Sequence, residues 1–526
     1  MTLLPLQKID VDVAIVGSGF GGSLTALGLL KRGRRVALIE RGRHPRFAIG
    51  ESSTPLANLL LEELADEYDL PRVRAFSQWG SWQRVHPEVA SGLKRGFTFY
   101  FHEPGRGFGD PDDRDRQLLV AASPNDEVSD THWYRPDFDH ALVREAEAAG
   151  AIYLDETKLD RLRLDGSHPV LEGVRDGRAV RVDAAFVVDA TGPRGFLHHA
   201  LHLGEAEQRW LPGTQGLYTH FEGVERWDRI HPPIAIPPYP VDDAAVHHVF
   251  EGGWIWILRF NNGLTSAGAA LTDARAAAIG ATGGEAAWHR LLAQLPAVKD
   301  QFIAARAALP FVHSPRVSFR SARVSGPSWA LLSSAAGVID PLLSTGFALT
   351  LFSIARLLDV LERTSPGPER AAALHAYERA TLDELDATER LVAALYASMD
   401  DPELFKRLTL LYFAAASFSE AARRLGRSHL APGFLLNAHP AFGAEMKACA
   451  SAAIARPRGQ ARRDLEARVD RAIEPFDTVG LLDRRRRDWY PVIAEDVIES
   501  APKLHATREE ILDLLERAGM GLTRSG

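Results

Sequence analysis

The order of apolar and polar positions near the N-terminus predicts two short buried strands joined by a helix. Residues 11–16 are mostly apolar, a glycine-rich turn follows, and residues 23–31 have the composition of a buried helix that ends at Gly33. Residues 35–40 enclose a second apolar run. A strand, a helix and a strand in this order are typical of a βαβ unit with parallel strands.

Apolar runs that alternate with turn-forming residues predict more elements farther along the chain. Up to residue 189 we expect a helix at 138–149 and strands at 97–101, 161–164, 171–174, 178–182 and 185–189. Residues 247–250, 254–260 and 264–271 predict antiparallel strands, and Asn261-Asn-Gly263 between the last two is a strong hairpin signal. Residues 329–333 predict another strand, and the chain beyond about residue 368 is mostly helical.

These patterns predict an α/β protein with a doubly wound, Rossmann-like nucleotide-binding domain, an inserted antiparallel-sheet domain and a helical C-terminal region. The expected divisions are residues 1–100 for the first βαβ part, 101–197 for the rest of the nucleotide-binding domain, 198–327 for the insertion, 328–366 for the return to the first domain, and 367–526 for the helical region. The inserted domain is the expected place for substrate.

Composition limits the classes of function. The net charge of −8 gives no support to a nucleic-acid partner. The only cysteine, Cys449, cannot form an internal disulfide, which fits a reducing cytoplasm. No metal site is expected, because the pairs His198-His199 and His247-His248 lack spaced carboxylate or thiolate companions. No secretory signal and no membrane-spanning apolar stretch is evident, so we expect a cytoplasmic protein; the oligomeric state stays open.

A dinucleotide site is predicted by Gly17-x-Gly19-x-x-Gly22, which follows a strand and opens a helix. In such a motif the first glycine permits a tight turn, the second lets the backbone approach a pyrophosphate and the third lets helix and strand pack closely. Glu40 lies 18 residues after Gly22, where an acid accepts hydrogen bonds from ribose hydroxyls, and it would repel the 2′-phosphate of NADP. The candidate cofactor contacts are Gly17, Ser18, Gly19, Phe20, Gly21, Gly22, Glu40 and Arg41.

Two later segments identify the dinucleotide by resemblance. Val187-Val-Asp-Ala-Thr-Gly192 and Ala335-Ala-Gly-Val-Ile-Asp-Pro341 resemble the second and third signatures of flavoproteins of the para-hydroxybenzoate hydroxylase group. That resemblance implies that the cofactor is FAD and that the first domain is an FAD-binding domain. The further contacts it implies are Thr191, Gly192, Ser334, Asp340, Gly346 and Phe347.

Four segments, in matching order over roughly the first 360 residues, resemble flavin-dependent halogenases more closely. They are the run from Glu40 that ends in Gly50-Glu51-Ser52, Lys94-Arg-Gly-Phe-Thr-Phe99, Gly253-Trp-Ile-Trp-Ile-Leu258 and Asp340-Pro-Leu-Leu-Ser-Thr-Gly346. The resemblance implies that reduced FAD reacts with oxygen, that chloride or bromide is oxidised to hypohalous acid, and that an electron-rich aromatic is halogenated. It places Gly50 and Glu51 near the flavin.

The same resemblance assigns roles to single residues. Lys94 would hold the hypohalous acid, by a hydrogen bond or as a chloramine, although an isolated lysine is usually solvated. Halide contacts are expected from Ser344, Thr345 and Gly346, because the N–H groups at a helix start attract an anion; Ser344 or Thr345 should also cap that helix.

Trp254 and Trp256 lie two apart on a predicted strand, so both indoles face one side. In halogenases such a pair forms a wall between flavin and substrate. Two aromatic residues in the core of a sheet are an equally good interpretation of the same pattern.

The chain departs from the family pattern at four positions. Leu258 replaces a proline, Ser333 a glycine, and Ser334 an aspartate that binds a ribityl hydroxyl, so FAD binding is expected to be weak and to suit a flavin delivered as FADH2 by a flavin reductase. Leu343 replaces a glutamate found in tryptophan halogenases, which argues against free tryptophan as substrate. Phenols, pyrroles, other indoles and larger scaffolds remain open, either free or bound to a carrier.

Three functions therefore compete. The first is an FADH2- and oxygen-dependent halogenase. The second is another oxidoreductase of the same fold, either a flavin monooxygenase, which would need no lysine, or a reductase of isoprenoid double bonds. The third is a non-catalytic flavin-binding protein, which Ser333 and Ser334 favour.

Overall fold

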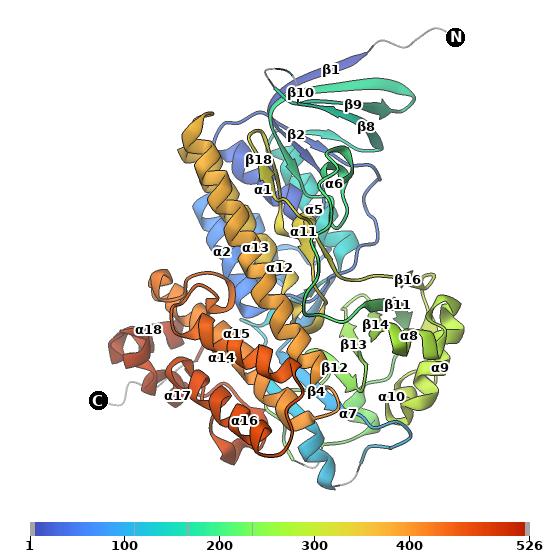
Figure 1. Cartoon of the computed structure of the whole chain (residues 1–526), viewed down its shortest axis with the longest axis vertical. Coiled ribbons are helices and arrows are strands. Elements are labelled where there is room, and N and C mark those ends of the chain that lie inside the picture. Colours follow the sequence, from blue (N-terminus) through green and yellow to red (C-terminus); the bar gives the residue numbers. More distant parts are fainter. Residues whose placement is uncertain (1–5, 110, 165, 167, 234, 521–526) are drawn as a thin grey trace.

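The computed structural model describes residues 6–109, 111–164, 166, 168–233 and 235–520 (Figure 1). Its first sheet has the strand order β18-β19-β10-β1-β2-β7, and β8 and β9 extend it as an antiparallel pair beside β10. β1 pairs in parallel with β10 and β2, β10 with β19, and β2 with β7. The strands are β1 (Gln7–Val16), β2 (Val36–Ile39), β7 (Ile152–Leu154), β8 (Thr157–Arg163), β9 (Val170–Arg175), β10 (Arg178–Asp189), β18 (Ser325–Gly326) and β19 (Trp329–Leu331).

Helices pack against this parallel sheet, which confirms the predicted α/β fold with its doubly wound first domain. Helix α1 follows β1 directly, as predicted, and contacts α5 and α12; α12 also contacts α2. The helices of the first two hundred residues are α1 (Phe20–Lys31), α2 (Pro55–Glu67), α3 (Pro71–Arg74), α4 (Trp79–Val85), α5 (Arg135–Ala148) and α6 (Phe196–Ala200).

The second sheet has the order β15-β11-β14-β13-β12-β4-β5-β21, and β16 pairs with β11. One of its faces packs on α7, α9 and α10 in a separate hydrophobic core, and the opposite face joins the main core. Its strands are β4 (Gly96–Phe101), β5 (Gln117–Ala121), β11 (Thr214–Glu222), β12 (Ala245–Phe250), β13 (Gly253–Arg259), β14 (Leu264–Thr272), β15 (Arg306–Ala307), β16 (Val312–Ser314) and β21 (Trp489–Tyr490). Its helices are α7 (Trp227–Ile230), α8 (Asp273–Ile279), α9 (Glu285–Gln294) and α10 (Pro296–Gln301).

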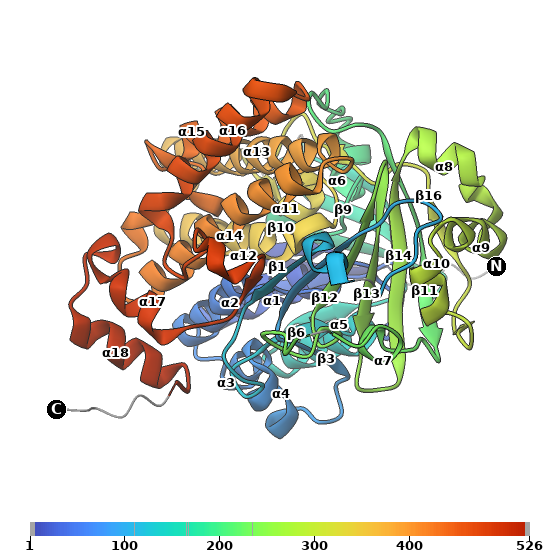
Figure 2. The same ribbon diagram turned by 90° about the horizontal axis from the view of Figure 1, so that it is seen from below.

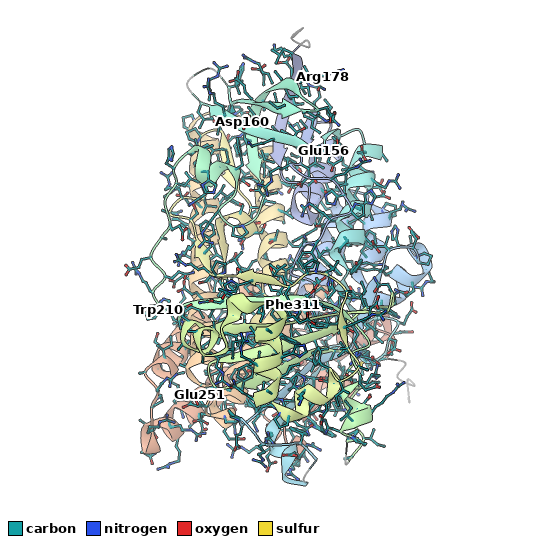
Figure 3. The ribbon with its side chains drawn as sticks, turned by 90° about the vertical axis from the view of Figure 1, so that its right-hand side faces the viewer. Glu156, Asp160, Arg178, Trp210, Glu251 and Phe311 are labelled. Carbon is teal, nitrogen blue, oxygen red and sulfur yellow. The ribbon has the colours of Figure 1, made fainter. Side chains whose placement is uncertain are left out.

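Figure 3 shows the first sheet in the upper part of the molecule, with Asp160 and Arg178, and the second sheet below it, with Glu251 and Phe311. Two small strand pairs are separate from both sheets: β3 (Ser91–Lys94) with β6 (Asp130–Trp133), and β17 (Phe319–Arg320) with β20 (Gly337–Val338).

The C-terminal region is helical, as predicted, and covers both the first sheet and one face of the second (Figures 1 and 2). Helix α13 contacts both α12 and α14, and α15 and α16 pack on α13 and α14. The helices are α11 (Ser333–Ala336), α12 (Gly346–Arg363), α13 (Pro368–Ala397), α14 (Pro402–Arg424), α15 (Phe442–Ile454), α16 (Gly459–Ile473), α17 (Ala494–Glu499) and α18 (Arg508–Arg517).

One helical stretch of the described residues, Leu342–Arg363, is apolar and long enough to cross a membrane, but 72% of its most apolar part is buried inside the fold. That burial is typical of the core helix of a soluble protein, so the stretch is only weak evidence for a membrane span.

The strands differ from the sequence prediction in three ways. The two short strands expected at 178–182 and 185–189 are one strand, β10, because the polar residues between them lie at alternating positions. β4 and β5 lie in the second sheet, although the predicted divisions assign residues 96–101 and 117–121 to the first domain. β21, near the C-terminus, pairs with β5 and was not predicted.

Candidate functional site

The turn between β1 and α1 has no room for side chains. A Cβ atom at Gly17 would lie 2.6 Å from the carbonyl oxygen of Ala190, and one at Gly22 would lie 1.9 Å from that of Gly17. Gly17 also has φ of +98°, which favours glycine. The close approach of Gly17 to the end of β10, and of Gly22 to Gly17, therefore requires glycine at both positions.

Glu40 stands at the end of β2 and is tied to this turn. The backbone N–H and the hydroxyl of Ser18 donate to Glu40 Oε2 at 3.2 and 3.1 Å, and Arg46 donates to the same oxygen at 3.2 Å. Burial alone would raise the pKa of Glu40, but the charge of Arg46 and the N–H groups of Gly42 and Ser18 hold it below its usual value. Glu40 is thus a carboxylate. Arg41 is exposed.

A buried ion pair beside the turn was not predicted from the sequence. Arg135 at the start of α5 forms two hydrogen bonds of 2.7 Å with Asp139, one turn later on the helix. Arg135 also donates to the carbonyl groups of Ile49 and Gly50, at 3.2 and 3.0 Å. An arginine and an aspartate four residues apart at a helix start were the only available sequence signal.

Two guanidinium groups and one carboxylate lie near Gly19. A Cβ atom there would lie 3.5 Å from a carboxylate oxygen of Asp139, 3.6 Å from a guanidinium nitrogen of Arg135 and 3.7 Å from one of Arg46. The start of α1 adds free N–H groups and partial positive charge. Two buried nitrogens of this region, Arg46 Nε and His44 Nδ1, have no partner among the described residues. The donor set therefore matches the phosphates of FAD, with Glu40 placed for a ribose.

The other two flavoprotein segments lie at the ends of neighbouring strands. Asp189 ends β10 and accepts hydrogen bonds from the N–H and hydroxyl of Thr191 and from the N–H of Leu197, which shapes the turn at Thr191 and Gly192. Ser334 lies in α11, directly after β19, and is half-buried. Ligands of open parallel sheets bind outside the carboxyl ends of the strands, and all three segments lie at that edge of this sheet.

Lys94 is fully buried, which excludes the solvated lysine that its residue type alone would favour. It ends β3, one strand before the strand at residues 96–101, and pairs with Asp130 of β6. Its amine donates to Ser52 Oγ at 2.9 Å and to the carbonyl oxygen of Ser53, and lies 3.8 Å from the centre of the Phe97 ring. The Gly-Glu-Ser segment thus holds the predicted catalytic lysine in place.

Burial and one carboxyl group set the charge of this amine. Burial lowers the pKa of Lys94, and Asp130 opposes that effect by raising it. Burial raises the pKa of Asp130, whose Oδ1 accepts from Asn58 at 3.1 Å, while its Oδ2 has no partner among the described residues. A fully buried lysine with a lowered pKa is suited to react as a neutral amine near neutral pH.

Glu51 links the first domain to the second sheet. Its Oε1 lies 2.8 Å from Nε2 of His220 on β11, and both side chains are fully buried. Its carbonyl oxygen accepts the N–H of Trp133 on β6 at 2.6 Å, and Gly50 before it has φ of +90°. Hydrogen bonds to β11 and β6 therefore fix the position of this segment.

The predicted halide loop consists of a short turn, Leu342–Ser344, and the start of α12. Leu343 and Ser344 have φ of +67° and +54°. The prediction that Ser344 or Thr345 caps the helix is wrong, because neither side chain forms a capping hydrogen bond in this left-handed path. The first N–H groups of α12 are thus left without side-chain partners. Gly346 is exposed, and a Cβ atom there would meet nothing within 4 Å.

Phe347 anchors the start of α12. Its ring stacks on Trp133 of β6 at 4.1 Å and meets Phe20 of α1 edge-on at 5.0 Å. The nucleotide turn, β6 and the halide loop therefore share one aromatic cluster. Strand β3, which carries Lys94, lies next to this cluster because it pairs with β6.

Trp254 and Trp256 face the same side of β13, as predicted, with ring centres 5.7 Å apart. Trp254 donates its indole N–H to Asp340 Oδ1 at 3.2 Å, and Trp256 donates to Ser266 at 3.2 Å. Asp340 also accepts the N–H of Leu342 and the hydroxyl of Tyr396. Burial raises the pKa of Asp340 to about 6.

Contacts connect the lysine to the halide loop. The Phe97 ring beside Lys94 lies 6.4 Å from that of Tyr412 on α14, and the Tyr412 hydroxyl donates to the carbonyl oxygen of Leu343 at 3.0 Å. A chain of contacts through Phe97 and Tyr412 therefore joins Lys94 to Leu343 of the halide loop.

Comparisons with known proteins agree with this geometry. The family model described as tryptophan halogenase matches residues 130–407, and that of an FAD-binding domain matches residues 10–215. Tetracycline 7-halogenase of Kitasatospora aureofaciens is 32% identical over 71% of this chain and 68% of its own length. Monodechloroaminopyrrolnitrin halogenase of Pseudomonas fluorescens is 32% identical over 75% and 69%. The crystal structure of halogenase PltM in complex with phloroglucinol and FAD superposes with a TM-score of 0.81 at 25% identity, covering 91% of this chain and 99% of PltM.

Proposed function

We propose, from the premise that this chain belongs to the flavin-dependent halogenase family, that Lys94 directs hypohalous acid onto a free, electron-rich aromatic molecule. The chain is an FAD-dependent halogenating enzyme that transfers a halide to an aromatic substrate. The proposal adds the dependence on FADH2 and oxygen, the route through hypohalous acid and the role of the lysine. The burial of Lys94 carries the last point, because a buried amine would meet the oxidant away from bulk water.

Each region of the site has one task in this proposal. FAD, when bound in its reduced form, would react with oxygen, and this reaction would supply the oxidising equivalents that convert halide into hypohalous acid. The N–H groups at Gly346 and Phe347 hold the halide, with the hydroxyls of Ser344 and Thr345 beside them. Lys94 receives the hypohalous acid, either as a hydrogen-bond donor or as a neutral amine that becomes a chloramine. Trp254 and Trp256 separate the substrate from the flavin side.

A free phenol or pyrrole is the proposed substrate class. Leu343 stands where tryptophan halogenases have a glutamate, and it is fully buried, so it offers no carboxylate to free tryptophan. Relatives whose names specify a pyrrole bound to a carrier protein are 23% and 24% identical, whereas those named for tetracycline and monodechloroaminopyrrolnitrin are 32% identical. PltM was solved with the free phenol phloroglucinol.

The test is a panel of phenols, pyrroles and indoles incubated with the FAD-loaded enzyme, a flavin reductase and NADH, with and without bromide. Halogenated product that requires bromide supports the proposal, and halide-independent hydroxylated product would instead identify a monooxygenase. Lys94→Met should abolish halogenation while oxidation of the reduced flavin and peroxide release continue. Lys406→Met is the matched control, because Lys406 is also buried but binds Asp488. Equal loss in both variants would refute the role of Lys94.

A further inference from the structure

The backbone of the halide loop adopts an unfavourable conformation that its own side chains do not secure. Leu343 and Ser344 are consecutive residues in the left-handed region, where residues with a Cβ atom are disfavoured. No side chain caps the helix that follows. Contacts from outside the loop must therefore hold the N–H groups of α12 in place for an anion.

Two tyrosines of the C-terminal helices provide such contacts. Tyr412 donates to the carbonyl oxygen of Leu343 at 3.0 Å, at the first left-handed residue. Tyr396 donates to Asp340 Oδ2 at 2.8 Å, while the other oxygen of Asp340 binds Trp254 and the loop's own Leu342 N–H. All of these groups are buried, so water does not compete for the bonds.

The two tyrosines come from neighbouring helices, Tyr396 from the end of α13 and Tyr412 from the middle of α14. Tyr412 lies beyond residue 407, where the match to the halogenase family model ends. Burial raises the pKa of both hydroxyls, so both remain protonated and can donate throughout the range in which the enzyme is assayed.

We propose that Tyr396 and Tyr412 are positioning residues through which the C-terminal helices hold the halide loop in its anion-binding form. This inference rests on the proposed function, because it assumes that the loop binds halide. The helices then do more than complete the core: they preorganise the N–H groups at Gly346 and Phe347. Since Tyr412 also packs on Phe97, whose ring lies beside the amine of Lys94, the same residue connects the loop to the lysine.

The test compares Tyr396→Phe, Tyr412→Phe and wild type in the FAD-loaded form. A lost buried hydrogen bond that preorganises the site should raise the bromide KM about five- to tenfold, with kcat changed less. Because binding stabilises by mass action, each variant should also need a higher bromide concentration than wild type for the same rise in its thermal unfolding midpoint. Tyr68→Phe is the control, because Tyr68 is buried and donates to Glu362 at the far end of α12.

The outcomes separate this inference from the proposed function. If wild type is stabilised by bromide but halogenates nothing in the panel, the proposed function fails, and the bromide shift of the variants still decides the tyrosine role. If wild type halogenates and the variants keep its bromide KM and its bromide-dependent stabilisation, the tyrosines do not position the loop. A wild type that is neither stabilised by bromide nor active overturns both.

Discussion

Replacing Asp130 by asparagine should move the pH dependence of halogenation to lower pH. Lys94 and Asp130 are directly paired across β3 and β6, and burial opposes the charged form of each. Cross-strand partners such as these have Cβ atoms roughly 5 Å apart. At a charge separation on the order of 6 Å and an effective dielectric constant of about 20, Coulomb's law gives about 3 kcal/mol.

That energy corresponds to at most about 2 pH units, because Asp130, whose own pKa is raised by burial, acts on the amine only where it is ionised. Asp130 favours the charged amine, so its loss lowers the pKa of Lys94. If the neutral amine is the active form, activity rises with pH through this pKa, and the rising limb of kcat/KM moves to lower pH by one to two units, a range on the order of the Coulomb estimate. If the ammonium is the active form, activity falls with pH, and the falling limb moves in the same direction.

The assay measures kcat/KM for an aromatic substrate that the enzyme halogenates, at saturating bromide and FADH2. The pH is varied from about 5 to about 10, which covers the range in which histidine and lysine side chains titrate in proteins. Asp126→Asn is the control, because Asp126 is exposed and pairs with Arg95 rather than with the lysine. A limb that stays in place, or that moves to higher pH, would refute the electrostatic coupling. The slope of the limb also decides between the amine and ammonium roles.

Three further substitutions test the site. Gly22→Ala should abolish FAD retention on gel filtration, because its Cβ would meet the carbonyl oxygen of Gly17. Gly346→Ala should leave the unfolding midpoint unchanged, since nothing lies near its Cβ, but should raise the bromide KM in steady-state assays. Arg135→Met should weaken FAD binding in fluorescence titrations and cost about 3 kcal/mol of stability in urea unfolding, because Asp139 stays buried without its partner. Unchanged FAD retention in the first variant, bromide KM in the second or FAD affinity in the third would contradict the role of the residue replaced.

Local patterns made the fold and part of the site predictable. The glycine spacing at Gly17 and Gly22 depends on contacts within one turn and the adjoining strand, so sequence alone identified it. The hairpin at Asn261-Asn-Gly263 joins β13 to β14 as predicted, with Gly263 at φ of +84°. The resemblance to halogenases selected Lys94, but only the structure established that it is buried.

Partners that come from distant segments were not predictable in this way. Asp130 faces Lys94 because β3 and β6 pair across 35 residues of intervening chain, and no local spacing encodes that register. Tyr396 and Tyr412 belong to a helical region whose apolar periodicity marks them only as core residues. The capping prediction failed because a Ser-Thr sequence before a helix is a statistical signal, whereas here Ser344 has a left-handed backbone and no side chain caps the helix.

The pairing of β21 with β5 has a practical consequence for anyone shortening this enzyme. Trp489 and Tyr490 cover the outer edge of the second sheet, and Arg114 stacks on the Trp489 ring at 3.4 Å. A truncated chain that ends before Trp489 would expose the N–H and C=O groups of β5 as a bare edge, ready to join a strand of another molecule. Trimming the C-terminus to gain solubility should therefore have the opposite effect and promote aggregation.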